Sequence, residues 1–244
     1  RRFPRVLDAM TRDSRQRAID PVPSAERTVV LEDFGRDDRE VDEVTWPEAF
    51  ERQVRTHPGA VAVVCEDQVW TYGGLNAAAN RLARQLVASG TRRGDFVAVA
   101  VPRSPSMVCA VLAVLKAGAA YLPLDPGYPE DRVAVTTRRA DVVVTAASWE
   151  GTLPGRLRRV FVDDPGVEQW PGSDLGIPIR TDDAAYVLHT SGSTGQPKGV
   201  VVTHDGVSSL IATAVDRLGV DSSSRVLQFA SIGFDVAVWE RCMA

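Results

Sequence analysis

Short apolar runs alternate along the chain with longer segments in which apolar residues recur at helical spacing. The apolar runs predict strands at 61–65, 96–101, 121–122, 141–145, 159–162, 186–189 and 200–202. Residues 69–72 are expected to form a hairpin with the first of these strands. The helical spacing predicts helices over about 46–57, 75–88 and 106–117, with others starting near Pro129 and near Asp205, which is expected to act as an N-cap. This order predicts an α/β fold with a mostly parallel sheet of βαβ units covered by helices on both faces.

The first 45 residues depart from this pattern. They are polar and charge-rich, and Pro21 and Pro23 interrupt them, although residues 24–27 are suited to a short helix. This composition predicts a domain tail followed by a linker over residues 1–45, and a folded domain over residues 46–244. The chain does not begin with Met, and it stops inside an amphipathic run, so we expect it to be an internal segment of a longer protein.

The overall charge excludes some classes of partner. The formal net charge is -4 and the three cysteines are far apart without CxxC spacing. An acidic chain has no general attraction for nucleic acid or anionic membranes, and the longest apolar run, 107–115, is too short to span a bilayer. The cysteines favour neither a disulfide framework nor a zinc site, and with no signal peptide visible we expect a cytoplasmic protein.

A glycine-rich loop after the apolar run 186–189 carries most of the candidate chemistry. Glycines allow the backbone N–H groups to approach a phosphate, hydroxyls add neutral donors, and a lysine adds a positive charge. The predicted phosphate-binding residues are Thr190, Ser191, Gly192, Ser193, Thr194, Gly195 and Lys198. The loop is not a Walker A motif, because Gly199 rather than Ser or Thr follows the lysine. A flexible polar loop without a ligand is the alternative.

Asp235 is a second candidate, because it is the one acidic residue of the stretch from Phe234 to Trp239. A carboxylate among apolar residues needs a partner, so it is either a substrate-binding group or a structural acid such as a helix N-cap. Trp239 lies four residues later and therefore on the same helical face. We expect Lys116, near a helix C-terminus, and His57 and His204, which have no nucleophile beside them, to be structural.

Four segments resemble one enzyme superfamily. Tyr-x-x-x-Thr-Ser-Gly-Ser-Thr-Gly-x-Pro-Lys-Gly, from Tyr186 to Gly199, resembles the ATP phosphate-binding loop of adenylate-forming enzymes. The segments 70–75, 115–125 and 234–240 resemble core motifs of its nonribosomal peptide synthetase branch, in the same order. His189 and Ala237 depart from the family pattern, which often has Tyr and Ser there. The resemblance implies an incomplete N-terminal large subdomain of the adenylate-forming fold, and residues 1–45 resemble, more weakly, the end of a condensation domain and its linker.

The resemblance also implies a reaction. An adenylation domain is a ligase that uses ATP and Mg²⁺ to convert an amino acid into an aminoacyl-adenylate, then transfers it to the phosphopantetheine of a downstream carrier domain, in the synthesis of antibiotics and other secondary metabolites. The remaining catalytic and magnesium-binding residues are expected beyond Ala244, and none is assigned here, so the segment alone is expected to be inactive. Acyl-CoA synthetase-like activation of a carboxylate, or a non-catalytic nucleotide-binding or docking module, are the alternatives.

The resemblance extends to the substrate pocket. Asp235 corresponds to the residue that pairs with the substrate amino group. The set Asp235, Val236 and Trp239 resembles the opening of serine-type pockets in the family, so serine is the expected substrate.

Overall fold

A computed structural model describes residues 2–12, 22, 24–33, 41–190 and 197–243 of the chain. They divide into two units, residues 1–40 and residues 41–244. The first unit contains α1 (Arg2–Arg12), α2 (Ser24–Thr28) and a π-helical turn, η2 (Val29–Asp33). The short helix expected near Ser24 is present. Helix α1 was not predicted, although Phe3, Leu7 and Met10 follow helical spacing.

The second unit opens with α3 (Trp46–Thr56) and an antiparallel hairpin of β1 (Val61–Cys65) and β2 (Gln68–Thr71). Thr45 starts α3 through a capping box with Glu48, and Pro47 occupies the first turn. The remaining elements are α4 (Tyr72–Ala88), β3 (Phe96–Ala100), α5 (Pro105–Lys116), β4 (Ala120–Pro123), α6 (Glu130–Thr136), β5 (Ala140–Thr145), β6 (Arg158–Phe161), η3 (Pro165–Gln169), β7 (Ala184–Thr190), β8 (Lys198–Thr203), α7 (Asp205–Leu218) and α8 (Asp235–Cys242).

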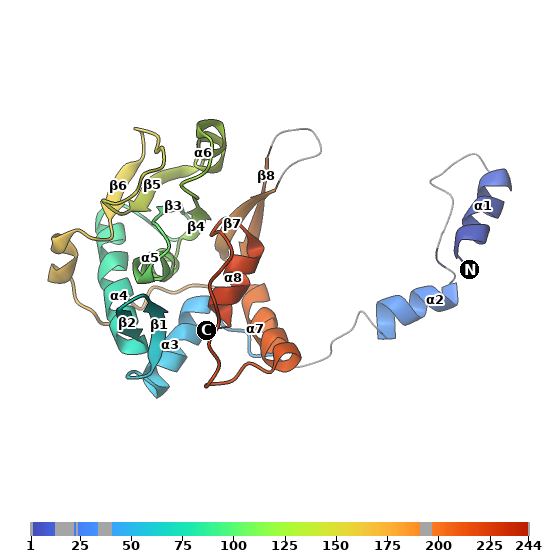
Figure 1. The fold of residues 1–244 in the computed structure, drawn as a ribbon, viewed down its shortest axis with the longest axis horizontal. Helices are drawn as coiled ribbons and strands as arrows, with labels where there is room; N and C mark the ends of the chain where they lie inside the picture. Colours follow the sequence, from blue (N-terminus) through green and yellow to red (C-terminus); the bar gives the residue numbers. More distant parts are fainter. Residues whose placement is uncertain (1, 13–21, 23, 34–40, 191–196, 244) are drawn as a thin grey trace. The chain divides into compact units, whose positions relative to one another are not determined.

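The six-stranded sheet has the order β6-β5-β3-β4-β7-β8 (Figure 1). Its pairs are parallel except β7 with β8, which are antiparallel. The predicted mostly parallel sheet is therefore confirmed. The exception follows from the chain itself, because only the short glycine-rich loop separates β7 from β8, and a parallel pair needs a long crossover.

Helices cover both faces of this sheet, as predicted. Side chains along a strand alternate between faces, so Val97 and Val99 point to a core shared with α4 and α5, while Ala98 and Ala100 point to a second core. Val133 of α6 belongs to this second core. None of the described helices is long and apolar enough to cross a membrane.

The expected N-cap at Asp205 is wrong. Asp205 is the first residue of α7, His204 precedes the helix, and the His204 side chain makes no capping hydrogen bond. The backbone N–H of Asp205 is held by the carbonyl of Thr181, which fixes it at the helix entry. The carboxylate of Asp205 thus lies in the first turn, where the helix dipole favours a negative charge.

Candidate nucleotide and substrate site

The carboxyl ends of the parallel strands β3, β4 and β7 lie along one edge of the sheet. Arg103 follows β3, Asp125 follows β4, and Thr190 ends β7 at this edge. Because β8 runs in the opposite direction, its first residue, Lys198, lies at the same edge. Ligands of open α/β sheets bind outside the carboxyl ends of strands, so this edge is the candidate site.

The two ends of the predicted phosphate loop are brought together here. Thr190 and Lys198 are direct partners across β7 and β8. The intervening site residues predicted from the sequence, which are Ser191, Gly192, Ser193, Thr194 and Gly195, lie outside the described residues.

Lys198 is exposed, and no ion pair joins it to another residue of the described ranges. Lysine charges near carboxylates form such pairs readily, so an exposed ammonium without one is suited to an anion from solution. Lys198 directly follows a sequence with three hydroxyl residues and two glycines. Its positive charge and these residue types are suited to binding the phosphate groups of a nucleotide.

Asp235 is the first residue of α8, and its carboxylate is exposed rather than buried as the apolar sequence around it suggested. The first turn of α8 points outward, since Phe234 and Val236 are 59% and 48% exposed, while Ala237 and Val238 face the core. The Oδ1 atom of Asp235 accepts a hydrogen bond from the backbone N–H of Val236, 2.9 Å away. The carboxylate therefore keeps acceptor positions for a cationic group.

Trp239 lies one turn further along α8 and is half-buried. Its indole N–H is buried and has no hydrogen-bond partner among the described residues. A buried donor without a partner is costly, so an acceptor near the start of α8 would be stabilising.

Helix α8 packs against β4, the neighbour of the strand that leads to the phosphate loop. Arg241 donates a hydrogen bond of 3.0 Å to the hydroxyl of Tyr121 on β4, and the Tyr121 ring lies 5.6 Å from that of Tyr186 on β7. Burial raises the pKa of Tyr186 to about 12, and the Asp235 carboxylate acts in the same direction, while the charge of Arg241 opposes it. The hydrogen bond from Arg241 therefore holds α8 against β4, the neighbour of β7 in the sheet.

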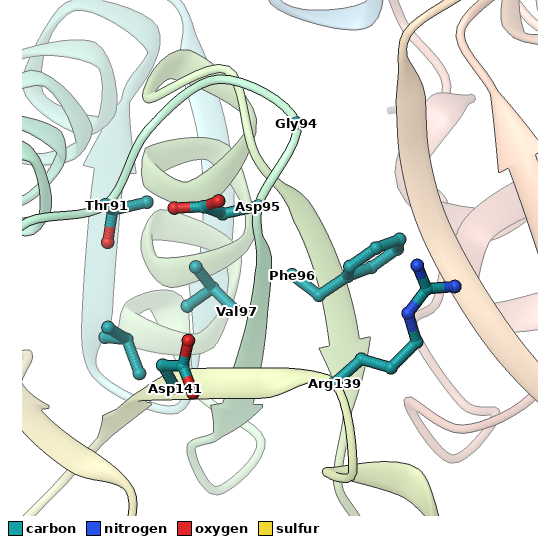
Figure 2. Close-up of a pocket in the computed structure, with 8 residues that line it drawn as sticks. Thr91, Gly94, Asp95, Phe96, Val97, Arg139 and Asp141 are labelled. Atoms are coloured by element: carbon teal, nitrogen blue, oxygen red, sulfur yellow. The ribbon is translucent and has the colours of Figure 1, made fainter.

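Two cavities flank the sheet. One, of about 240 Å³, lies at the amino ends of β3 and β5, where Asp95, Arg139 and Asp141 line it (Figure 2). It therefore belongs to the edge opposite the candidate site. The other, of about 250 Å³, lies beside the two ends of the phosphate loop and is lined in part by His189, Pro197 and Gly199. No group of three or more potential metal ligands occurs among His, Cys, Asp and Glu of the described residues.

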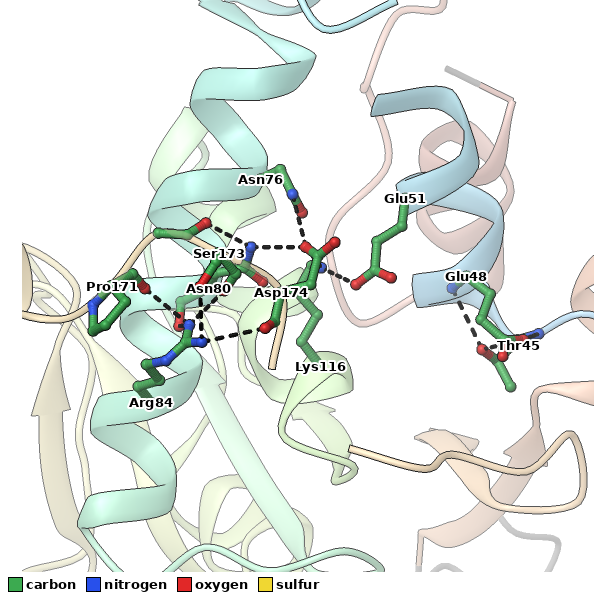
Figure 3. Close-up of polar contacts among 11 residues, drawn as sticks. Thr45, Glu48, Glu51, Asn76, Asn80, Arg84, Lys116, Pro171, Ser173 and Asp174 are labelled. Carbon is green, nitrogen blue, oxygen red and sulfur yellow. Dashed lines mark hydrogen bonds and ion pairs between the residues drawn. The ribbon is translucent and has the colours of Figure 1, made fainter. Parts of the chain in front are cut away.

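Lys116 has a structural role, as expected from its position near the C-terminus of a helix. It also forms ion pairs, which were not expected. It is almost fully buried and bonded to Glu51 of α3 and Asp174, with 3.4 Å to the latter (Figure 3). Burial would raise the pKa of Asp174, but hydrogen bonds from Asn76 and Asn80 and the charge of Lys116 hold it below its usual value. Sequence reasoning missed these partners because they are 58 and 65 residues from Lys116.

The second unit resembles known proteins. The model of the AMP-binding enzyme family matches residues 50–244. A probable non-canonical nonribosomal peptide synthetase, CymA of Salinispora arenicola, is 44% identical over 248 residues, which cover 98% of this chain and 3% of the relative.

Two crystal structures of the nonribosomal peptide synthetase FmoA3 share the fold. The AMPPNP-bound form is 32% identical with a TM-score of 0.82 and covers 91% of this chain and 24% of FmoA3. The form bound to alpha-methyl-L-serine-AMP is 30% identical with a TM-score of 0.81 and covers 99% of this chain and 28% of FmoA3. The chain thus spans a small part of the length of these relatives.

Proposed function

Because the chain belongs to the AMP-binding enzyme family, we propose that it forms part of an adenylation domain that activates an amino acid for nonribosomal peptide synthesis. The proposed reaction joins the amino acid carboxylate to the α-phosphate of ATP, with Mg²⁺, and releases pyrophosphate. The aminoacyl group then passes to the phosphopantetheine thiol of a carrier domain. Similarity to CymA and to FmoA3 with AMPPNP bound supports this proposal.

The observation that carries the proposal is the hairpin of β7 and β8 at the carboxyl edge of the sheet. Thr190 and Lys198 face each other at the two ends of the predicted phosphate loop. In the proposed role, residues 190–195 and Lys198 hold the β- and γ-phosphates and neutralise their charge. The protein then contributes positioning and charge stabilisation around the in-line attack on the α-phosphate. Mg²⁺ would supply further positive charge to stabilise the phosphates, and none of the described residues is assigned to hold it.

Asp235, Val236 and Trp239 form the proposed start of the amino-acid pocket. The free acceptor positions of the Asp235 carboxylate would take the substrate ammonium group, and Trp239 would limit the volume beside it. We propose serine as the substrate. FmoA3, which was crystallised with alpha-methyl-L-serine-AMP, supports a small hydroxylated side chain by similarity.

The proposed partners are domains of the same protein. Residues 1–45 would be the end of an upstream condensation domain and its linker, and residues 46–244 part of the adenylation domain, with a carrier domain downstream. We place the reaction in the cytoplasm, because free cysteines, of which Cys109 and Cys242 are buried, are suited to a reducing compartment.

Two other functions are distinguishable. An acyl-CoA synthetase-like enzyme would share the loop but would not need an acid for a substrate amine, so Asp235 favours the amino acid. A non-catalytic module would bind nucleotide without amino-acid-dependent exchange of pyrophosphate into ATP.

The role of the loop predicts the effect of replacing Lys198. In the complete adenylation domain, Lys198→Ala should lower ATP–pyrophosphate exchange by roughly 100-fold, since it removes a charge aimed at the phosphates. The melting temperature should stay unchanged, because Lys198 is exposed.

The matched control is Arg217→Ala, which removes another exposed cation, on α7. It should leave exchange unchanged. Full exchange activity in the Lys198→Ala protein would contradict the assignment of the loop.

A further inference from the structure

Residues 228–230, between α7 and α8, have no regular secondary structure, yet their carbonyl groups are held by one side chain. The guanidinium of Arg103, just after β3, donates to the carbonyls of Gln228 at 2.9 Å, Phe229 at 2.7 Å and Ala230 at 3.1 Å. Hydrogen bonds from a charged donor are stronger than neutral ones. Arg103 therefore fixes this segment to the carboxyl end of the central strand β3.

The N–H groups of the same segment are held from the other side. The carboxylate of Glu240, on α8, accepts hydrogen bonds of 3.2 Å from the backbone N–H groups of Phe229 and Ala230 and from the side-chain amide of Gln228. Within the described part of the chain neither Arg103 nor Glu240 forms an ion pair. Their charges thus act on the backbone between them. We call this arrangement the Arg103–Glu240 clamp.

Few degrees of freedom remain between the clamp and Asp235. The hydroxyl of Ser231 donates to the carboxylate of Asp125, which follows β4, and the N–H of Phe234 returns to the carbonyl of Ser231 at 3.0 Å. At Gly233 an added Cβ would lie 1.7 Å from the hydroxyl oxygen of Tyr128, so no larger residue fits without movement. The position of Asp235 is therefore set by contacts to β3, to the segment after β4, and to α8 itself.

We propose that Arg103 and Glu240 are positioning residues for amino-acid recognition, because the clamp fixes where the Asp235 carboxylate stands at the carboxyl edge of the sheet, the edge that also holds Thr190 and Lys198. The inference rests on the proposed function, in which Asp235 pairs with the substrate ammonium group. Neither side chain needs to touch the substrate. Both act through the backbone of residues 228–230.

The test uses the complete adenylation domain with L-serine and with glycerate, which has a hydroxyl in place of the α-amine. Arg103→Ala should raise KM for serine by about 10- to 100-fold, as expected when a binding group is displaced by about 1 Å. KM for ATP should stay within about two-fold. The preference for serine over glycerate should fall, as it should in Asp235→Ala.

Arg84→Ala is the matched control. Arg84, on α4, also donates to the backbone carbonyls of Pro171, Ser173 and Asp174, and to that of Asn80 on its own helix (Figure 3). These contacts lie beside the ion pairs of Lys116, away from Asp235. Its loss should lower the melting temperature without changing the preference for serine over glycerate. An equal loss of preference in both variants would mean that Arg103 has only a structural role and would overturn the inference.

Milder substitutions keep the test valid if Arg103→Ala does not fold. Arg103→Lys retains the charge but presents one ammonium to three carbonyls, so it should restore only part of the serine preference. Glu240→Gln should give the same selective rise in KM for serine. Because both residues hold one segment, the effects of Arg103→Lys and Glu240→Gln together should be smaller than the product of the two separate effects.

Amide hydrogen exchange gives a readout that does not depend on activity. The amides of Phe229 and Ala230 should exchange at least ten-fold faster in Glu240→Gln than in the parent, and unchanged exchange would overturn the clamp. If Asp235→Ala keeps the full preference for serine, the proposed pocket fails. If Asp235→Ala loses it and Arg103→Lys and Glu240→Gln do not, only the present inference fails.

Discussion

The imidazole of His204 is almost fully buried and links two distant parts of the second unit. Its Nδ1 atom accepts a hydrogen bond of 3.2 Å from the backbone N–H of Trp46, at the start of α3. A neutral imidazole with an accepting Nδ1 carries its proton on Nε2. Nearby, Ser208 of α7 donates to the carbonyl of Val44 at 3.1 Å. These two residues fasten the start of the folded domain to the first turn of α7.

The buried imidazole predicts a pH dependence of stability. Burial lowers the pKa of His204 to about 4, although the charges of Asp183, Glu48 and Asp205 act in the opposite direction. The unfolded chain, with a pKa near 6.5, binds a proton before the folded chain does. The stability is therefore fully present above about pH 6.5 and falls as the pH drops toward 4, by on the order of 3 kcal/mol in total.

Melting curves at pH 7 and pH 4.5 would measure this effect. His204→Asn keeps an acceptor for the Trp46 N–H without a group that titrates in this range, so its stability should depend less on pH. His57→Asn, at an exposed histidine, is the control and should behave like the parent. Equal pH dependence in all three proteins would contradict the account of His204.

At the scale of elements, charged residues tie helices together inside the core. Lys116, at the end of α5, meets Glu51 of α3 and Asp174, which also accepts hydrogen bonds from Asn76 and Asn80 of α4. A buried ammonium is tolerated only when carboxylates and further hydrogen bonds compensate its lost hydration. The cluster therefore holds three helices in one arrangement beside the sheet.

Two neighbouring residues of α3 provide a direct comparison. Glu51→Ala should destabilise the protein by roughly 3 kcal/mol, because it leaves Lys116 buried with a single, more distant carboxylate. Arg52→Ala breaks the pair with Asp42, whose side chains are 53% and 82% exposed, and should cost less than about 1 kcal/mol. Chemical unfolding measures both, and equal costs would show that burial does not determine the strength of these pairs.

Strand and helix positions follow from the sequence because their apolar periodicity is strong. The runs at 96–101 and 141–145 form strands that are buried apart from their first residues, Phe96 and Asp141, and both are interior strands of the sheet. The strand order does not follow from the sequence, since it depends on how separate βαβ units stack. The antiparallel direction of β8 could be inferred only from the short loop before it, because a parallel neighbour needs a long crossover.

At the scale of the whole second unit, the candidate site joins elements far apart in the chain. The motif around Lys198 and the apolar setting of Asp235 identify candidate residues without a structure. Arg103 and Glu240 could not be identified that way. Arg103 bonds to backbone carbonyls 125 to 127 residues away, and such contacts leave no side-chain pattern in the sequence. The exposure of Asp235 was also not predictable, because it depends on which side of α8 packs against the sheet.

The central claim is that this chain belongs to a domain that recognises an α-amino acid through Asp235 and activates it with ATP. The most direct test is ATP–pyrophosphate exchange by the complete adenylation domain, with each common amino acid and with glycerate, for the parent and for Asp235→Ala. The account predicts the strongest exchange with serine, and its loss by roughly 100-fold or more in Asp235→Ala, since substrate binding would take the ammonium group out of water and a desolvated charge left without its partner costs about 3–5 kcal/mol. ATP binding should remain. Exchange that depends only on carboxylates lacking an α-amine, or that is unaffected by Asp235→Ala, would contradict it.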